Sequence, residues 1–272
     1  MNTFGCILSS VDLRDYRLKR GLVDKKDIPD SYNINMLHRI KNQEDVSSCT
    51  AHALSSILEY HDNNVVTLST NFIYGIRRKL YGMTGKGEQL RVALNISKDY
   101  GDPRKNLCNG NTEVDAVFDI AERAYEDQAV VDDAYKHRIK SYVKLSNDDE
   151  VKYAIMNYGP VLASIEWYLD NNYNPETHFI DTEKVSSKSY HAIVIYGWDE
   201  DGWLCQNSWG ISWGNNGLFR IKYDYGLKEI YSVIDDENLS SDTDEVIKPA
   251  NNKIIEFILK LINKIINWVL GR

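Results

Sequence analysis

Asn42-Gln-Glu-Asp-Val-Ser-Ser-Cys-Thr-Ala-His-Ala-Leu-Ser-Ser-Ile-Leu-Glu-Tyr60 is a polar loop that changes into a helix. Ser47 and Ser48 are favourable N-cap residues, and apolar residues follow them at mostly helical spacing. Cys49 therefore falls in the first helical turn, where unpaired N–H groups and the helix dipole favour a thiolate. A free cysteine more often packs as a small apolar side chain, so this stretch alone favours an inert core cysteine over a nucleophile.

The composition excludes several classes of protein. A chain of 272 residues with 43% hydrophobic residues can form one large or two-lobed domain with a real core. A net charge of −8 argues against nucleic acid as a partner. The four cysteines are far apart and form no C-x-x-C pair, which predicts neither a disulfide framework nor a metal site, and no cofactor is expected.

The first residues carry no signal for secretion. The longest early apolar run is Cys6-Ile7-Leu8, and charged residues follow it, which differs from the apolar core of a signal peptide. We therefore expect a cytoplasmic protein. Residues 1–27 are interpreted as a polar leader, and the turn at Ile28-Pro29 marks the start of a domain over residues 28–235.

The two halves of that domain differ in the spacing of their apolar residues. Residues 28–140 are predicted to be mainly helical, because apolar residues recur at helical spacing over 68–81 and 88–100. Residues 141–235 are predicted to be mainly β, with short apolar runs separated by turns. The expected fold class is therefore α+β, with two lobes and a cleft between them.

The C-terminal part has a composition of its own. Residues 236–251 contain several acidic residues and a single lysine, which predicts a solvated acidic linker. Residues 252–272 are predicted to form an amphipathic helix with a narrow polar stripe. Lys260 and Lys264 within it disfavour a membrane-spanning helix. Binding to a membrane surface, which would make the protein a peripheral membrane protein, and packing onto its own domain or a second copy are equally compatible with it.

A cysteine nucleophile needs a base, a group that orients the base, and donors for an oxyanion. His191 opens an apolar strand, and Asn207 follows the return strand sixteen residues later, across a turn at Asp199–Gly202. Antiparallel pairing around this turn would bring His191 and Asn207 side by side. Gln43 lies six residues before Cys49, where its amide could donate to an oxyanion.

With these spacings the chain resembles the papain-like cysteine proteases. The resemblance rests on Gln43, Cys49, His191 and Asn207-Ser208-Trp209-Gly210, and it covers roughly residues 28–235. It implies a papain-like two-lobed fold, with a helical left lobe that carries the nucleophile and a β-barrel-like right lobe that carries the histidine and asparagine. It also implies a cysteine peptidase whose partners are peptide or protein substrates.

The resemblance assigns a role to each catalytic candidate. Cys49 would attack the scissile carbonyl as a thiolate. His191 would hold the thiolate as an imidazolium and then protonate the leaving amine, and Asn207 would orient the ring. Gln43 and the N–H group of Cys49 would bind the oxyanion.

Four further residues gain roles from the same resemblance. Trp209 would shield the His191–Asn207 hydrogen bond from water, and Trp213 would line the side of the leaving group. Ser164 would lie at the base of the main specificity pocket, and Gly87 would pair with the substrate backbone.

The chain also departs from the family pattern around the cysteine. Glu44 and Ser47 stand where the family usually has glycine, and Thr50 stands where it has tryptophan. Val46 replaces a cysteine of a family disulfide, in agreement with a reduced compartment. A leader of 27 residues is shorter than the inhibitory pro-segment of lysosomal relatives.

Two alternatives stay open. His52 lies one helical turn after Cys49 on the same face and competes as its base, although no Asn or Asp is placed to orient it. The second alternative concerns function. The chain could be a catalytically silent papain-fold scaffold that acts through membrane or partner binding of residues 252–272.

Overall fold

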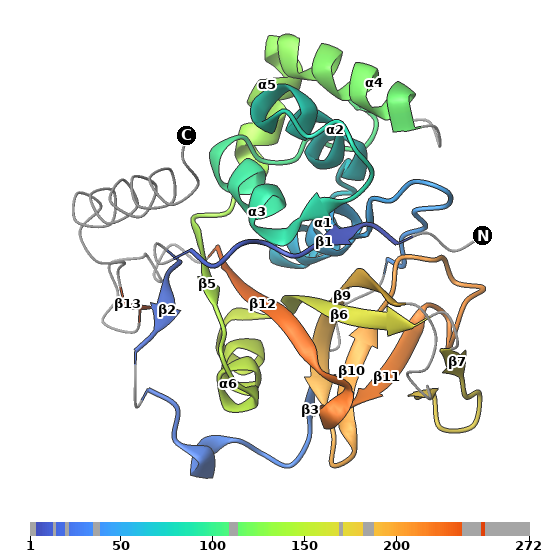
Figure 1. Cartoon of the computed structure of the whole chain (residues 1–272). Helices are drawn as coiled ribbons and strands as arrows, with labels where there is room; N and C mark the ends of the chain where they lie inside the picture. Colours follow the sequence, from blue (N-terminus) through green and yellow to red (C-terminus); the bar gives the residue numbers. More distant parts are fainter. Residues whose placement is uncertain are drawn as a thin grey trace, which may run out of the picture.

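The computed structural model describes residues 4–12, 15–19, 22–34, 39–108, 114–168, 171–181, 188–235 and 246–247. These residues form a helical lobe and a β lobe, drawn at the top and bottom of Figure 1. The predicted α+β class with two lobes is confirmed. The predicted helix over residues 252–272 and most of the predicted linker over 236–251 lie outside the described residues.

The helical lobe is built around α1, which carries Cys49 at its first position. A serine cap and a left-handed glycine bound the next helix, since Ser69 Oγ accepts from Phe72 N at 3.3 Å and Gly82 has φ 66°. Two helices of this lobe pack closely where one of them has Gly75, because a Cβ at that position would lie only 2.2 Å from Ala121 Cβ. The helices are α1 (Cys49–His61), α2 (Thr70–Tyr81), α3 (Leu90–Asp99), α4 (Val114–Glu126), α5 (Gln128–Ala134) and the short η2 (Tyr135–His137).

The β lobe is a nine-stranded mixed sheet with the order β11-β10-β9-β6-β12-β5-β2-β13, and β3 pairs with β9. Within the described residues the path of this sheet stays open, which does not contradict the expected barrel-like lobe. The strands are β2 (Arg17–Leu18), β3 (Tyr32–Asn33), β5 (Ser141–Lys144), β6 (Val161–Tyr168), β9 (Lys188–Trp198), β10 (Gly202–Gln206), β11 (Leu218–Lys222), β12 (Leu227–Ile234) and β13 (Val246–Ile247).

One helix and several short elements complete this lobe. Helix α6 (Asp148–Tyr158) begins after Asn147, whose side chain accepts from Glu150 N at 2.9 Å. The short elements are η1 (Lys25–Asp27), η3 (Tyr223–Tyr225) and the pair β7 (Asn172–Tyr173) and β8 (Ile180–Asp181).

Strand β9 joins the two lobes because its side chains alternate between two cores. Ala192 and Val194 belong to the core around α1, whereas Ile193 and Ile195 belong to the core of the β lobe. Its neighbours on either side are β6 and β10, both antiparallel. The strand thus presents its first residues, including His191, at the junction of the lobes.

The N-terminal residues are integrated into the fold. Strand β1 (Cys6–Ile7) pairs in parallel with β4 (Glu88–Gln89), and β2 pairs in parallel with β5. Figure 1 shows the blue N-terminal trace with β1 running between the helices and the sheet. Strand β13, from the predicted linker, pairs antiparallel with β2. None of the described helices is both long enough and apolar enough to cross a membrane.

Candidate active site

Cys49 lies at the N-terminus of α1 and faces the junction of the lobes. Its side chain is 0% exposed, and its Sγ accepts from the backbone N–H of Ala192 at 3.4 Å. Ser48 occupies the N-cap position, but its hydroxyl makes no capping bond and instead contacts Val46 O and His52 Nδ1. The thiol is therefore held beside the residue that follows His191.

His191 and Asn207 lie side by side, as the hairpin spacing predicts. His191 Nε2 is 2.8 Å from Asn207 Oδ1, and that oxygen also accepts from Ser208 N at 2.7 Å. An amide oxygen only accepts, so Nε2 carries the proton of a neutral His191 ring. His191 Nδ1 is buried and has no hydrogen-bond partner among the described residues. This nitrogen has the free lone pair, so it is the one that can accept a proton as a base.

Aromatic rings exclude water from this pair. The Trp209 ring stacks on His191 with centroids 4.7 Å apart and planes at 28°. Trp167 meets the same imidazole edge-on at 5.4 Å. The sequence singled out Trp209 but not Trp167, for which the only signal was its place at the end of an apolar strand.

Gln43 is fixed by the turn that follows Asn207. Its Oε1 accepts from Ser208 Oγ at 2.6 Å, and its backbone N–H donates to Ser208 O at 2.9 Å. Its Nε2 donates to Val46 O at 3.1 Å. The Val46 carbonyl only accepts, so it determines which end of the Gln43 amide is the nitrogen, and the Ser208 hydroxyl links the Gln43 loop to the β lobe.

The three outer candidates lie on different walls of the junction. Trp213 is half-buried and meets Trp209 edge-on at 5.1 Å. Ser164 is fully buried in β6, and its Oγ accepts from Glu229 N at 3.1 Å. Gly87 has φ 86° and lies just before β4, where a Cβ would come within 2.7 Å of Gly5 O.

The chain's own N-terminal segment, residues 4–9, crosses this junction. Gly5 O accepts from Glu88 N at 2.6 Å, and a Cβ on Gly5 would lie 1.9 Å from Ser47 O, so only glycine fits there. The Phe4 ring meets His191 edge-on at 6.0 Å. The thiol of Cys6 makes hydrogen-bonding contact with Ser164.

The segment has a defined direction across the site. Its first end contacts Trp209, since the Phe4 and Trp209 rings are 5.8 Å apart. Its other end is held by Glu229, whose Oε1 accepts from Ser9 N at 2.9 Å. Cys49 and His191 are consequently both closed off from solvent.

Burial under this segment sets the protonation of the pair. It raises the pKa of the Cys49 thiol to about 11, although the Ala192 and Gly5 N–H groups favour the thiolate. It lowers the pKa of His191 to about 4, against the effect of the hydrogen bond to Asn207. The helix terminus predicts a thiolate, but in the covered site at neutral pH the pair is a thiol and a neutral imidazole.

In the described part of the chain, no group of three or more His, Cys, Asp or Glu side chains is placed to share a metal ion. The chemistry available to the site is that of a thiol, an imidazole and amide donors.

The comparisons with known proteins agree with this geometry. Residues 23–234 match the model of the papain family of cysteine proteases. Ananain from Ananas comosus is 27% identical over 68% of this chain, which spans only 52% of ananain. An uncharacterized peptidase C1-like protein of Acanthamoeba polyphaga mimivirus is 26% identical over 74% of this chain and 67% of its own length.

A solved structure shares the fold. Xylellain, a cysteine protease from Xylella fastidiosa, superposes with a TM-score of 0.74 at 19% identity, over 86% of this chain and 96% of xylellain. At this identity the likeness concerns the fold alone.

Proposed function

Because the chain belongs to the papain family of cysteine proteases, we propose that it hydrolyses peptide bonds with Cys49 as nucleophile and His191 as its base. The observation that carries this proposal is the arrangement around β9. The Ala192 amide contacts Cys49 Sγ at 3.4 Å, and the preceding residue, His191, has its Nε2 bound to Asn207 and its Nδ1 unpartnered among the described residues.

Acylation uses these groups in order. His191 Nδ1 takes the proton of Cys49, and the thiolate forms a bond to the carbonyl carbon of the substrate. The charge that develops on the carbonyl oxygen is stabilised by the N–H of Cys49 and the side-chain amide of Gln43. The imidazolium then gives its proton to the leaving amine, the C–N bond breaks, and a thioester remains on Cys49.

Deacylation reverses the roles of His191. The imidazole takes a proton from water, the resulting hydroxide attacks the thioester carbonyl, and the thiol leaves with the proton from the ring. Throughout, Asn207 Oδ1 accepts from Nε2, and the stacked Trp209 keeps water from this hydrogen bond. The acid product and the free thiol restore the starting state.

The N-terminal segment would have to leave before a substrate binds. In the proposed roles the acyl part of a substrate lies near Gly87 and Ser164, and the leaving amine lies near Trp213. The segment runs the other way, from Phe4 beside Trp209 to Ser9 beside Glu229. Its peptide bonds are therefore presented in the reverse direction, which favours a latent rather than a self-cleaving state.

The full burial of Cys49 also favours a second candidate, a catalytically silent papain-fold scaffold. Such a protein would act through membrane or partner association of residues 252–272. The two candidates differ in the reactivity of the thiols. A scaffold would alkylate Cys49 no faster than the buried Cys108 or Cys205 at neutral pH.

Peptide hydrolysis by the purified full chain, run beside a Cys49→Ala variant, tests the proposed function. We expect hydrolysis by the wild-type chain and none by the variant, because no other group replaces the nucleophile. Ser56→Ala, a change in the same helix away from the thiol, serves as the control and should keep the activity. Full activity of Cys49→Ala would contradict the proposal.

A further inference from the structure

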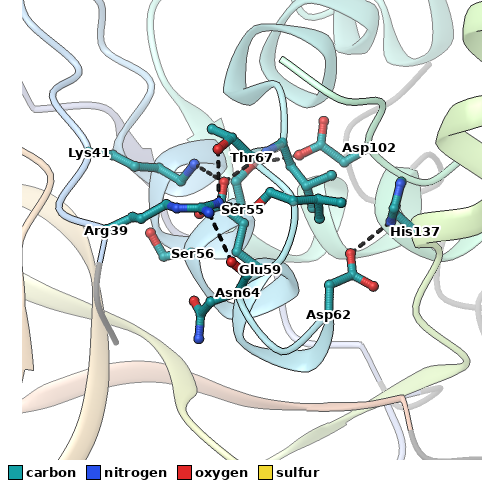
Figure 2. A network of polar contacts seen from close by, with 12 residues as sticks. Arg39, Lys41, Ser55, Ser56, Glu59, Asp62, Asn64, Thr67, Asp102 and His137 are labelled. Carbon is teal, nitrogen blue, oxygen red and sulfur yellow. Dashed lines mark hydrogen bonds and ion pairs between the residues drawn. The ribbon is translucent and has the colours of Figure 1, made fainter. Parts of the chain in front are cut away.

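A buried ion pair links the helix that carries Cys49 to the loop that carries Gln43. Lys41 Nζ lies 2.6 Å from Glu59 Oε1, and the two side chains are 11% and 2% exposed (Figure 2). Glu59 lies in α1, ten residues after Cys49, and Lys41 lies two residues before Gln43. The catalytic steps described above use neither residue.

The pair is fixed from the side of the helical lobe. Glu59 Oε1 also accepts from Leu68 N at 2.8 Å, so the carboxylate is oriented by two donors. Arg39 lies in the same segment as Lys41 and Gln43, residues 39–43, and it donates to Asn64 O and to Thr67 Oγ1, both at 2.8 Å. Two cationic side chains of the segment therefore reach the C-terminal half of α1 and the turn after it (Figure 2).

The same segment is fixed from the β lobe through its backbone. Gly210 N donates to Lys41 O at 3.0 Å, and Asn42 forms a bridge with Trp209. These bonds place the segment beside the turn after Asn207, but they do not reach α1. The Lys41 side chain makes the short link to the helix of the nucleophile, and Arg39 Nη1 adds a longer contact, 4.0 Å from Glu59 Oε2.

Charge explains why this link is costly to break. The ion pair is short and shielded from water, so removal of one partner leaves a buried charge without compensation. Nearby Asp102 accepts from Ser55 Oγ at 2.7 Å, and burial raises its pKa far above the usual range although Lys41 acts to lower it. The short ion-pair contact of Lys41 is with Glu59.

We propose that the Lys41–Glu59 ion pair positions Gln43, so that its amide donor reaches the oxyanion that forms at Cys49. An oxyanion donor acts over a narrow range of about 2.7–3.1 Å, so a small shift of the loop weakens it. Both residues are positioning residues, since they act through Gln43 and touch no substrate. This inference rests on the proposed peptidase function and deepens it.

The test separates a mispositioned donor from a damaged fold. Peptide hydrolysis passes through an oxyanion, whereas alkylation of Cys49 by iodoacetamide displaces iodide and forms none. Both reactions need the thiolate and the departure of the N-terminal segment, so those requirements cancel in the ratio of the two rates. The ratio of kcat/KM to the second-order rate constant of alkylation therefore reports on the oxyanion donors.

For Lys41→Met in the full chain we expect this ratio to fall about 10- to 100-fold, somewhat less than the loss of a whole oxyanion donor. KM should stay within about threefold, because the interaction is made in the transition state. In a Gln43→Ala background the same substitution should change the ratio less than about twofold, since the donor that it positions is already gone.

Two further variants keep the test decisive. Ser55→Ala removes a buried hydrogen bond of the same helix that does not reach the Gln43 loop, and it should leave the ratio unchanged. If Lys41→Met does not fold, Lys41→Gln combined with Glu59→Gln removes both charges but keeps a hydrogen bond, and its ratio should fall between those of wild type and Gln43→Ala.

The outcomes distinguish the two levels of the proposal. An active wild type in which neither Lys41→Met nor the double glutamine variant changes the ratio would overturn the positioning role alone. The positioning role would also be overturned if Lys41→Met lowered the ratio by the same factor in the Gln43→Ala background as in wild type. A wild type without Cys49-dependent hydrolysis would overturn the proposed function, and the positioning role with it.

Discussion

Two buried histidines flank Cys49, one in each lobe, and they differ in how their rings are held. His52, one turn further along α1, has Nδ1 at 2.9 Å from Ser48 O, and the Asn42 backbone also contacts it. His191 in β9 is held through Nε2 by Asn207, with no described partner at Nδ1. Burial lowers both pKa values, to about 3 for His52 and about 4 for His191.

The difference teaches that burial and closeness in sequence do not select a base. The His52 ring donates to the Ser48 carbonyl of its own helix, which leaves it a structural role. The His191 ring is oriented by a side-chain amide of its own lobe, and the next residue, Ala192, contacts the Cys49 thiol of the other lobe. The predictions below test this contrast.

The largest effect is expected for His191→Ala. Without the base, no group takes the proton of Cys49 or protonates the leaving amine, so kcat/KM should fall by at least about 1,000-fold. Steady-state hydrolysis of a peptide substrate measures it. Retention of more than a tenth of the activity would show that His191 is not the base.

Asn207→Ala should have a smaller effect. The imidazole stays, but its tautomer and orientation are no longer fixed, and kcat should fall by about 10- to 1,000-fold. The pH profile of kcat/KM provides a readout beyond folding, because loss of an acceptor that favours the charged ring should lower the pKa attributed to His191. An unchanged profile together with unchanged kcat would remove Asn207 from the mechanism.

Phe4→Ala tests the N-terminal segment, residues 4–9, which covers His191 and not His52. The ring contacts His191, Trp167 and Trp209, and such aromatic contacts contribute about 0.5–1.5 kcal/mol. Their loss should favour the open site and raise peptidase activity and Cys49 alkylation together, by about two- to tenfold. A fall in both rates would mean that the segment supports the site and does not block it.

Acid should open the cover in the same way. In the covered site the pKa of His191 is about 4, below its ordinary value of about 6.5, so the uncovered imidazole binds a proton more readily. The stability that the neutral ring gives to the covered state is therefore present above pH 6.5 and lost as the pH falls toward 4. The hydrogen-exchange protection of Cys6 and Ile7, relative to the intrinsic exchange rate at each pH, should fall over this range in wild type but not in His191→Gln.

The smallest effect on activity is expected for His52→Ala. Loss of the contacts with Ser48 should lower the free energy of unfolding by about 1–2 kcal/mol, and kcat/KM should stay within about threefold. Urea unfolding and peptide hydrolysis measure the two quantities. A loss of activity as large as that of His191→Ala would reverse the assignment of the two histidines.

Local patterns in the sequence were enough to predict much of this arrangement. Helical periodicity predicts α1 and α2, and the hairpin spacing places His191 beside Asn207. The register of β9 and β10 fixes that contact over a short loop, so few long-range contacts are needed. Gln43 is also found from local sequence, because it lies six residues before Cys49.

Other features depend on contacts that periodicity does not report. Strands β1 and β4 have two residues each and pair across about eighty residues of chain, so the cover over Cys49 has no local signal. Glu88 was assigned to the helix over 88–100, but its N–H bonds to Gly5 O, and α3 begins only at Leu90. Ser48 was assigned as a capping side chain, but its hydroxyl contacts His52 instead.

Titration of the full chain with iodoacetamide tests the central claim most directly, with intact mass and peptide mapping to locate the label. The account predicts that peptide hydrolysis falls in proportion to the label on Cys49 and reaches zero when Cys49 is fully labelled, whatever label Cys6 takes. Cys108 and Cys205 should stay unlabelled, because they are buried and lie outside the N-terminal segment that uncovers Cys49 when it departs. Hydrolysis that persists in a chain fully labelled at Cys49 would contradict it.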